Sequence, residues 1–98
     1  MTMDASKVSE HSVSEQWLVY ILRCADGSFY TGITNDLARR CTQHNAGVAS
    51  RYTRSRRPVR AVYEEFQPTR SLALQREAAI KALSRTEKEA LILSGERW

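Results

Sequence analysis

Cysteines and long apolar runs are scarce in this sequence, and their scarcity excludes several classes of protein. The two cysteines, Cys24 and Cys41, cannot build a disulfide framework and do not stand in a zinc-binding motif. No apolar run approaches the roughly 20 residues of a membrane-spanning helix. The first residues lack the apolar segment of a signal peptide. We therefore expect a cytoplasmic protein with reduced cysteines and no membrane partner.

Acidic residues are fewer than basic ones, and most of the chain is more basic than the total suggests. The 98 residues carry 15 Lys and Arg against 11 Asp and Glu, a net charge of +4. Residues 1–15 hold three acids against one lysine, are rich in serine and show no apolar periodicity, so we expect a disordered tail. Residues 16–95 are expected to form one domain. Its charge of about +6 favours nucleic acid or another anionic partner.

Two short apolar runs around a turn open this domain. Residues 17–24 (WLVYILRC) and 28–33 (SFYTGI) are rich in β-branched and aromatic residues, which favours strands. The turn sequence Ala-Asp-Gly at 25–27 lies between them, so the segment is predicted to form a β-hairpin.

The length of the hairpin loop decides which side chains share a face. A two-residue loop would pair Arg23 with Tyr30 and put Tyr20 and Tyr30 on opposite faces. A three-residue loop, with Gly27 in the left-handed conformation, pairs Leu22 with Tyr30 and puts both tyrosines on one face. We favour the three-residue loop because it keeps the other face apolar. That face consists of Trp17, Val19, Ile21, Phe29 and Ile33.

A helix is predicted after the hairpin, from a cap at Thr34 or Asn35 to about Ala46, before Gly47. One stripe of this helix combines apolar and polar side chains, and Arg39 points away from it. The stripe consists of Leu37, Arg40, Cys41 and His44. Arg40 and His44 are therefore expected to face the body of the domain.

The rest of the chain adds a strand and two helices. A strand is predicted over 59–66, a helix over about 70–83 and a last helix over about 85–93, which opens with a capping box of Ser84 and Glu87. The residues predicted to face inward on the first of these helices are Leu72, Ala79, Ile80 and Leu83. The order β-β-α-β-α-α predicts an α/β fold with a three-stranded, mainly antiparallel sheet flanked by helices.

Arginines gather in the segment 48–58, which is predicted to be a loop. Such a segment would contact phosphates with little sequence preference and with strong salt dependence. A base-stacking role for Tyr52 in the same segment is the less favoured interpretation. The candidate nucleic-acid-binding residues are Arg51, Arg54, Arg56 and Arg57.

The sequence Val-Tyr-Ile at 19–21 is followed by Tyr-Thr-Gly at 30–32, and the first helix ends in His-Asn-Ala-Gly at 44–47. This combination of motifs resembles the GIY-YIG nuclease superfamily, and above all its small stand-alone bacterial members. The resemblance covers about residues 16–93. It implies a divalent-metal-dependent endonuclease that cuts DNA, with RNA not excluded, acting in DNA repair or processing.

The resemblance also assigns roles to residues. It implies Tyr20 and Tyr30 as the two family tyrosines, Arg40 as the phosphate-binding arginine, and Glu77 as the ligand of Mg²⁺ or Mn²⁺. His44 stands where many members carry a tyrosine or histidine. A lone carboxylate is acceptable for Mg²⁺, which keeps several waters and takes further ligands from phosphate.

Our hypothesis for the chemistry makes Tyr20 the general base or the group that orients the attacking water. Nearby Arg40, His44 and a metal are expected to make its phenolate more accessible. His44 would then take the proton on, and Tyr30 would position water or phosphate. The two tyrosines could exchange these roles.

Simpler alternatives exist for the same residues. Arg40 has Asp36 at i−4 and Glu77 has Lys81 at i+4, spacings at which helical ion pairs form. The alternative function is a non-catalytic nucleic-acid-binding module on the same scaffold, because this chain has Ile33 where several members carry lysine. A third is an interaction module, with a protein partner that targets it.

Overall fold

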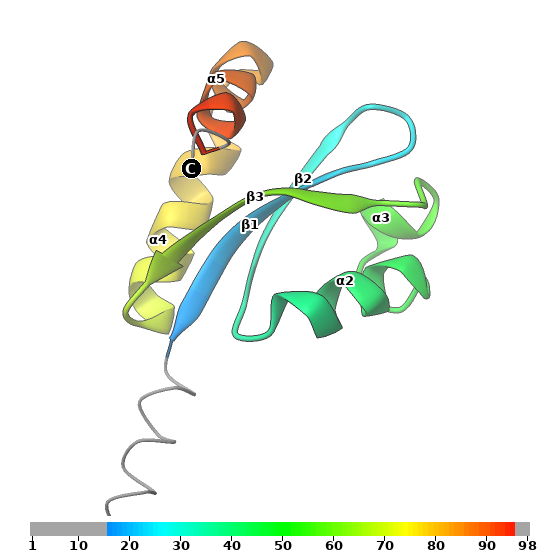
Figure 1. Cartoon of the computed structure of the whole chain (residues 1–98), viewed down its shortest axis with the longest axis horizontal. Coiled ribbons are helices and arrows are strands. Elements are labelled where there is room, and N and C mark those ends of the chain that lie inside the picture. Colours follow the sequence, from blue (N-terminus) through cyan, green and yellow to red (C-terminus); the bar gives the residue numbers. More distant parts are fainter. Residues whose placement is uncertain (1–15, 96–98) are drawn as a thin grey trace, which may run out of the picture.

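The computed structural model describes residues 16–95 as one three-stranded sheet with helices on both faces (Figure 1). The predicted tail at 1–15 lies outside the described residues. The elements in chain order are β1 (Trp17–Arg23), β2 (Phe29–Thr34), α2 (Leu37–Asn45), α3 (Arg51–Arg54), β3 (Arg60–Gln67), α4 (Arg70–Lys81) and α5 (Arg85–Gly95). This order confirms the predicted β-β-α-β-α-α fold, with the short helix α3 added.

The strands lie in the order β2-β1-β3 and both pairings are antiparallel. The central strand β1 is covered on both faces, and its residues 19–22 are all at most 1% exposed. A strand that is buried on both faces has apolar residues at successive positions, as residues 19–22 do here.

The hairpin has the three-residue loop that the sequence favoured. Leu22 pairs with Tyr30, the Cys24 amide donates to the Ser28 carbonyl at 2.8 Å, and Gly27 has φ +85°. A positive φ is the conformation in which glycine avoids the strain of a Cβ atom. The loop therefore fixes the register that puts Tyr20 and Tyr30 on one face.

The two faces of the sheet carry separate apolar cores. On one face, α4 and α5 pack over a core built around Val19 and Ile21. On the other face, α2 and α3 lie over Tyr20, Leu22 and their neighbours. Figure 1 shows the two helix pairs on opposite sides of the sheet. This arrangement confirms the predicted division of the hairpin side chains.

Helix α2 begins later than predicted. Its cap is Asp36, whose side chain accepts a hydrogen bond from the Arg39 amide at 3.1 Å. Thr34 instead holds the preceding turn, where its Oγ1 accepts from the Asp36 amide at 3.1 Å. The helix ends before Gly47, which has φ +82° as expected of a glycine after a helix end.

The prediction of a loop over 48–58 is wrong for its middle part, where α3 forms. Ser50 caps this helix, because its Oγ accepts from the Thr53 amide at 3.1 Å. The segment is rich in arginine, which favours a loop, but a serine cap is enough to start a short helix within it.

The prediction for the inner side of α4 is partly wrong. Ala73 and Ile80 are fully buried, whereas Leu72 is 42% exposed and Ala79 is also exposed. The capping box of α5 is confirmed, since the Ser84 amide donates to Glu87 Oε1 at 2.8 Å and the Glu87 amide donates to Ser84 Oγ at 3.1 Å.

The hairpin turn is tied to segments on both faces of the sheet: the turn that follows α3 and the helix α5. On one side, Arg56 Nε donates to Asp26 Oδ2 at 3.0 Å. On the other, Arg85 Nη1 of α5 donates to the Gly27 carbonyl at 2.9 Å, and its guanidinium lies 4.5 Å from the centre of the Phe29 ring. Within residues 16–95 no helix has the length and apolar character needed to cross a membrane.

Candidate active site

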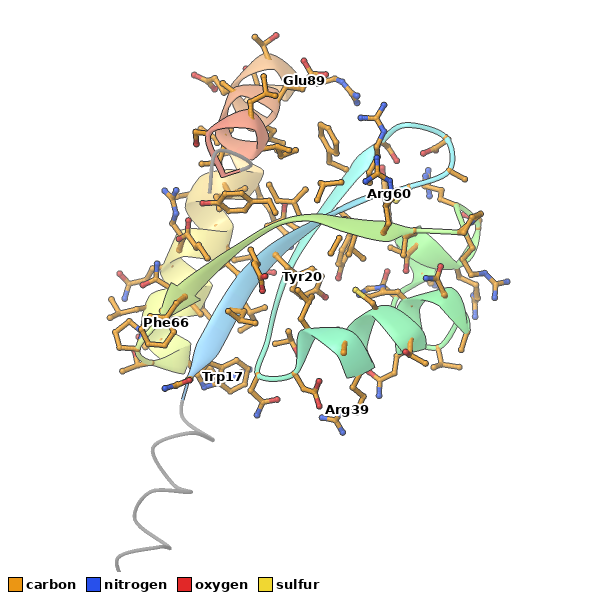
Figure 2. The ribbon with its side chains drawn as sticks, viewed as in Figure 1. Trp17, Tyr20, Arg39, Arg60, Phe66 and Glu89 are labelled. Atoms are coloured by element: carbon orange, nitrogen blue, oxygen red, sulfur yellow. The ribbon has the colours of Figure 1, made fainter. Side chains whose placement is uncertain are left out.

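Tyr20 and Gly32 face each other across β1 and β2, and the tyrosine ring lies over the glycine. The two residues are direct partners in the antiparallel register. A Cβ atom at position 32 would lie 2.6 Å from Tyr20 Oη and 2.7 Å from its Cζ, closer than non-bonded atoms approach. Only glycine therefore leaves room for this ring, which is 1% exposed. Figure 2 shows Tyr20 between the sheet and α2.

His44, near the end of α2, reaches the same place. Its side chain is fully buried, and its Nε2 lies 2.9 Å from Tyr20 Oη. The ring of Tyr30 from β2 lies edge-on to His44, with centroids 5.1 Å apart, and 6.5 Å from the Tyr20 ring. The structure thus brings together three of the predicted site residues, which we call the tyrosine–histidine cluster: Tyr20, Tyr30 and His44.

Burial sets the protonation states in this cluster. It raises the pKa of Tyr20 to about 12, although the Arg40 guanidinium acts in the opposite direction. Burial, together with the positive charge of Arg40, lowers the pKa of His44 to about 4. His44 is therefore neutral at neutral pH. The expectation of a more accessible Tyr20 phenolate is wrong for the protein by itself, because loss of hydration outweighs the nearby arginine.

Arg40 is half-buried beside the cluster, as the helical stripe predicted. Its Nη1 donates to Gln43 Oε1 at 3.0 Å. The ion pair considered between Arg40 and Asp36 goes instead to Arg39, whose Nε lies 3.8 Å from Asp36 Oδ2. Figure 2 shows Arg39 on the outer side of α2. Arg40 lines a cleft of about 210 Å³ with Trp17, Ile33, Thr34, Asn35, Arg39 and Gln43.

Glu77 comes from α4, which packs on the other face of the sheet. Ala73 and Ile80 are fully buried and mark the side of α4 that faces the sheet. Successive helical residues are turned by about 100°, so Arg76 and Glu77 flank that buried line on opposite sides. Arg76 lies on the β3 side, where its Nε donates to Glu65 Oε2 at 2.7 Å. Glu77 therefore lies on the side of β2, the edge strand that carries Tyr30.

The described contacts do not join Glu77 to the tyrosine–histidine cluster. Its carboxylate pairs with Lys81 Nζ at 3.3 Å, which is the ion pair considered as the alternative. The side chain retains 19% exposure. The structure thus gives Glu77 a neighbour on its own helix and no described contact with the other predicted site residues.

The residues present fit a metal only in one limited way. Among residues 16–95, no group of three or more His, Cys, Asp or Glu side chains is arranged to hold a cation. Glu77 offers one partly exposed carboxylate, a hard oxygen donor of the kind that Mg²⁺ takes while keeping most of its waters. A hydrated cation shared with a substrate phosphate fits these residues, whereas a closed site formed by the protein does not.

The four candidate arginines divide into two kinds. Arg57 donates from Nε to the Arg54 carbonyl at 2.9 Å and from Nη1 to the Asn45 carbonyl at 3.3 Å. Arg56 binds Asp26 and the Tyr52 carbonyl. Arg56 and Arg57 thus make side-chain hydrogen bonds within the protein. Arg51 and Arg54 lie exposed on α3, and the described hydrogen bonds do not engage their side chains.

A surface pocket of about 420 Å³ adjoins α3. It is lined by Asn45, Arg54, Ser55, Arg57 and Pro58. Tyr52 is less available to a base than its sequence position suggested. Its ring stacks on Tyr30 at 6.1 Å, and the Arg56 guanidinium lies 3.8 Å from its centre.

Sequence reasoning missed one residue of this site. Thr53 of α3 is fully buried, and its Oγ1 lies 2.8 Å from His44 Nδ1. The Ser-x-x-Thr spacing from Ser50 was a signal for the helix cap, but nothing in the sequence indicated that the threonine would reach a histidine on another helix.

The family comparison covers the elements that build this site. A family model described as the GIY-YIG catalytic domain matches residues 16–90. The match spans β1, β2 and α2, which carry the tyrosine–histidine cluster, and continues through α4, which carries Glu77.

Relatives and solved structures point the same way. UPF0213 protein DP2720 of Desulfotalea psychrophila is 55% identical over 82 residues, which cover 83% of this chain and 74% of that protein. UPF0213 protein Reut_B5558 of Cupriavidus pinatubonensis is 49% identical over 79 residues, covering 81% and 88%.

Two solution NMR structures are similar in fold. Protein EF2693 from E. faecalis has a TM-score of 0.59 at 40% identity, covering 86% of this chain and 90% of that one. UPF0213 protein BH0048 from Bacillus halodurans has a TM-score of 0.53 at 44% identity, covering 82% and 86%. The family resemblance seen in the sequence is thereby confirmed. The chain belongs to the GIY-YIG family, a family of endonucleases.

Proposed function

We propose that this protein is a divalent-metal-dependent endonuclease that hydrolyses phosphodiester bonds in DNA, in DNA repair or processing. The observation that carries the proposal is the tyrosine–histidine cluster. It presents a neutral imidazole nitrogen 2.9 Å from a tyrosine hydroxyl, beside the half-buried guanidinium of Arg40. A cytoplasmic location remains a prediction.

In the proposed mechanism, Tyr20 passes protons without being a phenolate in the resting protein. With a pKa of about 12, its hydroxyl is almost entirely protonated at neutral pH. It can accept a proton from the attacking water only if its own proton moves to His44 Nε2 at the same time. The 2.9 Å hydrogen bond provides the path for that second transfer.

The other residues orient the phosphate and the water. Arg40 is proposed to bind the scissile phosphate through parallel hydrogen bonds from its guanidinium. Tyr30 is more exposed than Tyr20 and is proposed to position the water or the phosphate. A Mg²⁺ or Mn²⁺ ion held through Glu77 would stabilise charge on the phosphate and on the leaving oxygen.

The DNA backbone is proposed to continue from the cluster along α3. The exposed Arg51 and Arg54 lie there, next to the pocket lined by Arg57. Contacts of this kind position a nucleic acid without reading its bases.

The first test of the proposal is cleavage of linear, single-stranded and branched DNA with Mg²⁺ or Mn²⁺. Wild type should cut, and Glu77→Gln should bind DNA without cutting, because the substitution keeps the shape and removes the charge. The matched control is Glu89→Gln, which removes an exposed carboxylate from α5 and should leave cleavage unchanged. Equal cleavage by wild type and Glu77→Gln would contradict the role of Glu77.

The tyrosine roles are tested by Tyr20→Phe and Tyr30→Phe. Loss of cleavage in Tyr30→Phe but not in Tyr20→Phe would reverse the assignment made above. The alternative function, a nucleic-acid-binding module, is favoured by Ile33, which stands where several family members carry lysine. Salt-dependent binding by wild type and Glu77→Gln, with cleavage by neither, would establish it.

A further inference from the structure

Both ring nitrogens of the buried His44 have hydrogen-bond partners. Nε2 lies 2.9 Å from Tyr20 Oη, and Nδ1 lies 2.8 Å from Thr53 Oγ1. A neutral imidazole carries one N–H and one lone pair, so it donates to one partner and accepts from the other. If Thr53 accepts a hydrogen bond from Nδ1, then Nε2 keeps its lone pair and can take a proton from Tyr20. If Tyr20 accepts from Nε2, the lone pair is on Nδ1 instead.

Ser50 offers the Thr53 hydroxyl proton an acceptor other than His44. The Ser50 carbonyl oxygen lies 3.4 Å from Thr53 Oγ1, and the Ser50 hydroxyl oxygen lies 3.0 Å from it. With its proton directed to the carbonyl, the threonine oxygen presents a lone pair to His44. Nδ1 then carries the hydrogen, and Nε2 accepts from Tyr20.

The opposite arrangement leaves a buried proton without an acceptor. If Nε2 carried the hydrogen, it would donate to Tyr20 Oη, and the tyrosine proton would have no acceptor among the described contacts. A buried donor without an acceptor loses its hydrogen bond to water and gains none in the protein, so this arrangement is disfavoured. The chain of donors running from Tyr20 to His44 to Thr53 to Ser50 satisfies every one of these protons.

We propose that Thr53 is a positioning residue that holds His44 in the Nδ1–H tautomer, so that Nε2 is available to accept the Tyr20 proton. Ser50 caps α3, and its carbonyl and hydroxyl oxygens both lie within hydrogen-bonding distance of Thr53 Oγ1. The cap of this helix therefore also places the Thr53 hydroxyl beside His44. The consequence of this tautomer for cleavage rests on the proposed nuclease function. The assignment of the tautomer is independent of that function.

The decisive measurement is the tautomer of His44, read from nitrogen chemical shifts of the full chain labelled with ¹⁵N-histidine at pH 7. The chain has two histidines, and His44→Gln identifies which signals belong to position 44. Wild type should show protonated Nδ1 and unprotonated Nε2. Thr53→Ser, which keeps the hydroxyl, should give the same pattern. Thr53→Val keeps the shape and loses the hydroxyl, so one buried proton lacks an acceptor in either tautomer. Its spectrum should therefore show the Nε2–H form alongside the Nδ1–H form.

Two results would overturn the proposal. One is an Nε2–H tautomer in wild type, a result that needs no variant to fold. The other is a Thr53→Val spectrum that keeps the wild-type pattern.

Cleavage provides the second readout. Thr53→Val should lower kcat by about 10- to 100-fold with little change in KM, by analogy with the loss when a hydrogen-bond partner of a metal-bound histidine is removed. Thr53→Ser should recover most of the activity. Thr42→Val, at an exposed threonine on α2, is the control and should cut like wild type. If wild type does not cut, the nuclease proposal fails while the tautomer measurement still decides the role of Thr53.

Discussion

At the scale of single residues, the buried imidazole of His44 makes the protein sensitive to mild acid. Its pKa of about 4 in the folded state lies below the 6.5 of an exposed histidine, so between these values the unfolded chain binds the extra proton. The free energy of unfolding should therefore hold above pH 6.5 and fall as the pH drops toward 4, by up to about 3 kcal/mol. Urea denaturation at a series of pH values from 7.5 to 4.5 measures this loss.

The control for this prediction is His44→Gln, which does not titrate. It is expected to be less stable at pH 7 but to lose less stability between pH 6.5 and 4.5 than wild type. Equal losses in the two proteins would show that another group is responsible.

Gly32 is predicted to be intolerant of even the smallest side chain. In Gly32→Ala the new methyl group would meet Tyr20 Oη and Cζ, and such overpacking costs about 1–3 kcal/mol. Chemical denaturation measures the cost. In a Tyr20→Leu background the colliding atoms are gone, so Gly32→Ala should cost much less. The same cost in both backgrounds would contradict the proposed collision.

Single residues also show where sequence reasoning succeeds. The apolar alternation around the Ala-Asp-Gly turn was enough to place Tyr20, Tyr30 and Gly32 on one face, because hairpin register follows from local rules. The contact from Thr53 to His44 depends on how two helices pack, and threonine is too common to signal it. The raised pKa of Tyr20 could not be predicted from the sequence either, because it results mainly from burial in the folded chain.

At the scale of elements, we predict that different arginines in and just after α3 contribute to DNA binding and to stability. Arg54→Gln should weaken binding to a labelled duplex and lower the salt dependence by about one counterion. Its free energy of unfolding should stay within about 0.5 kcal/mol of wild type. Fluorescence anisotropy and urea denaturation measure the two effects.

Arg56→Gln is the matched comparison. It loses the contact with the Tyr52 ring and the ion pair with Asp26, so it should destabilise the protein by about 1 kcal/mol. A larger loss of stability in Arg54→Gln than in Arg56→Gln would contradict the division of these arginines.

The side of α4 that packs on the sheet could not be predicted from its apolar residues alone. Leu72 and Ala79 were predicted inward because of their residue types. The packed side instead follows the line from Ala73 to Ile80, with the charged Arg76 and Glu77 at its flanks. Arg76 also pairs with Glu65 of β3, a partner distant in sequence, so residue types along α4 alone did not indicate which side would pack.

At the scale of the whole molecule, the two cores are predicted to contribute to stability while only one affects the cluster. Ile80→Ala should lower the free energy of unfolding by about 2–5 kcal/mol, because it leaves a cavity under α4. Leu72→Ala, on the same helix but 42% exposed, should cost less than about 1 kcal/mol. Both should keep the wild-type His44 spectrum. Equal costs would favour the sequence-based orientation of α4.

The hairpin turn at 25–27 has a further consequence for handling the protein. A short polar turn is ordinarily where a chain accepts an insertion or is nicked by a protease. Here Asp26 is bound by Arg56 from one side of the sheet, and the Gly27 carbonyl is bound by Arg85 from the other. A peptide tag inserted at this turn should disrupt both contacts, and so loosen the hairpin from the segment around Arg56 and from α5 at once. For the same reason, the turn should be among the last exposed loops that a protease can open.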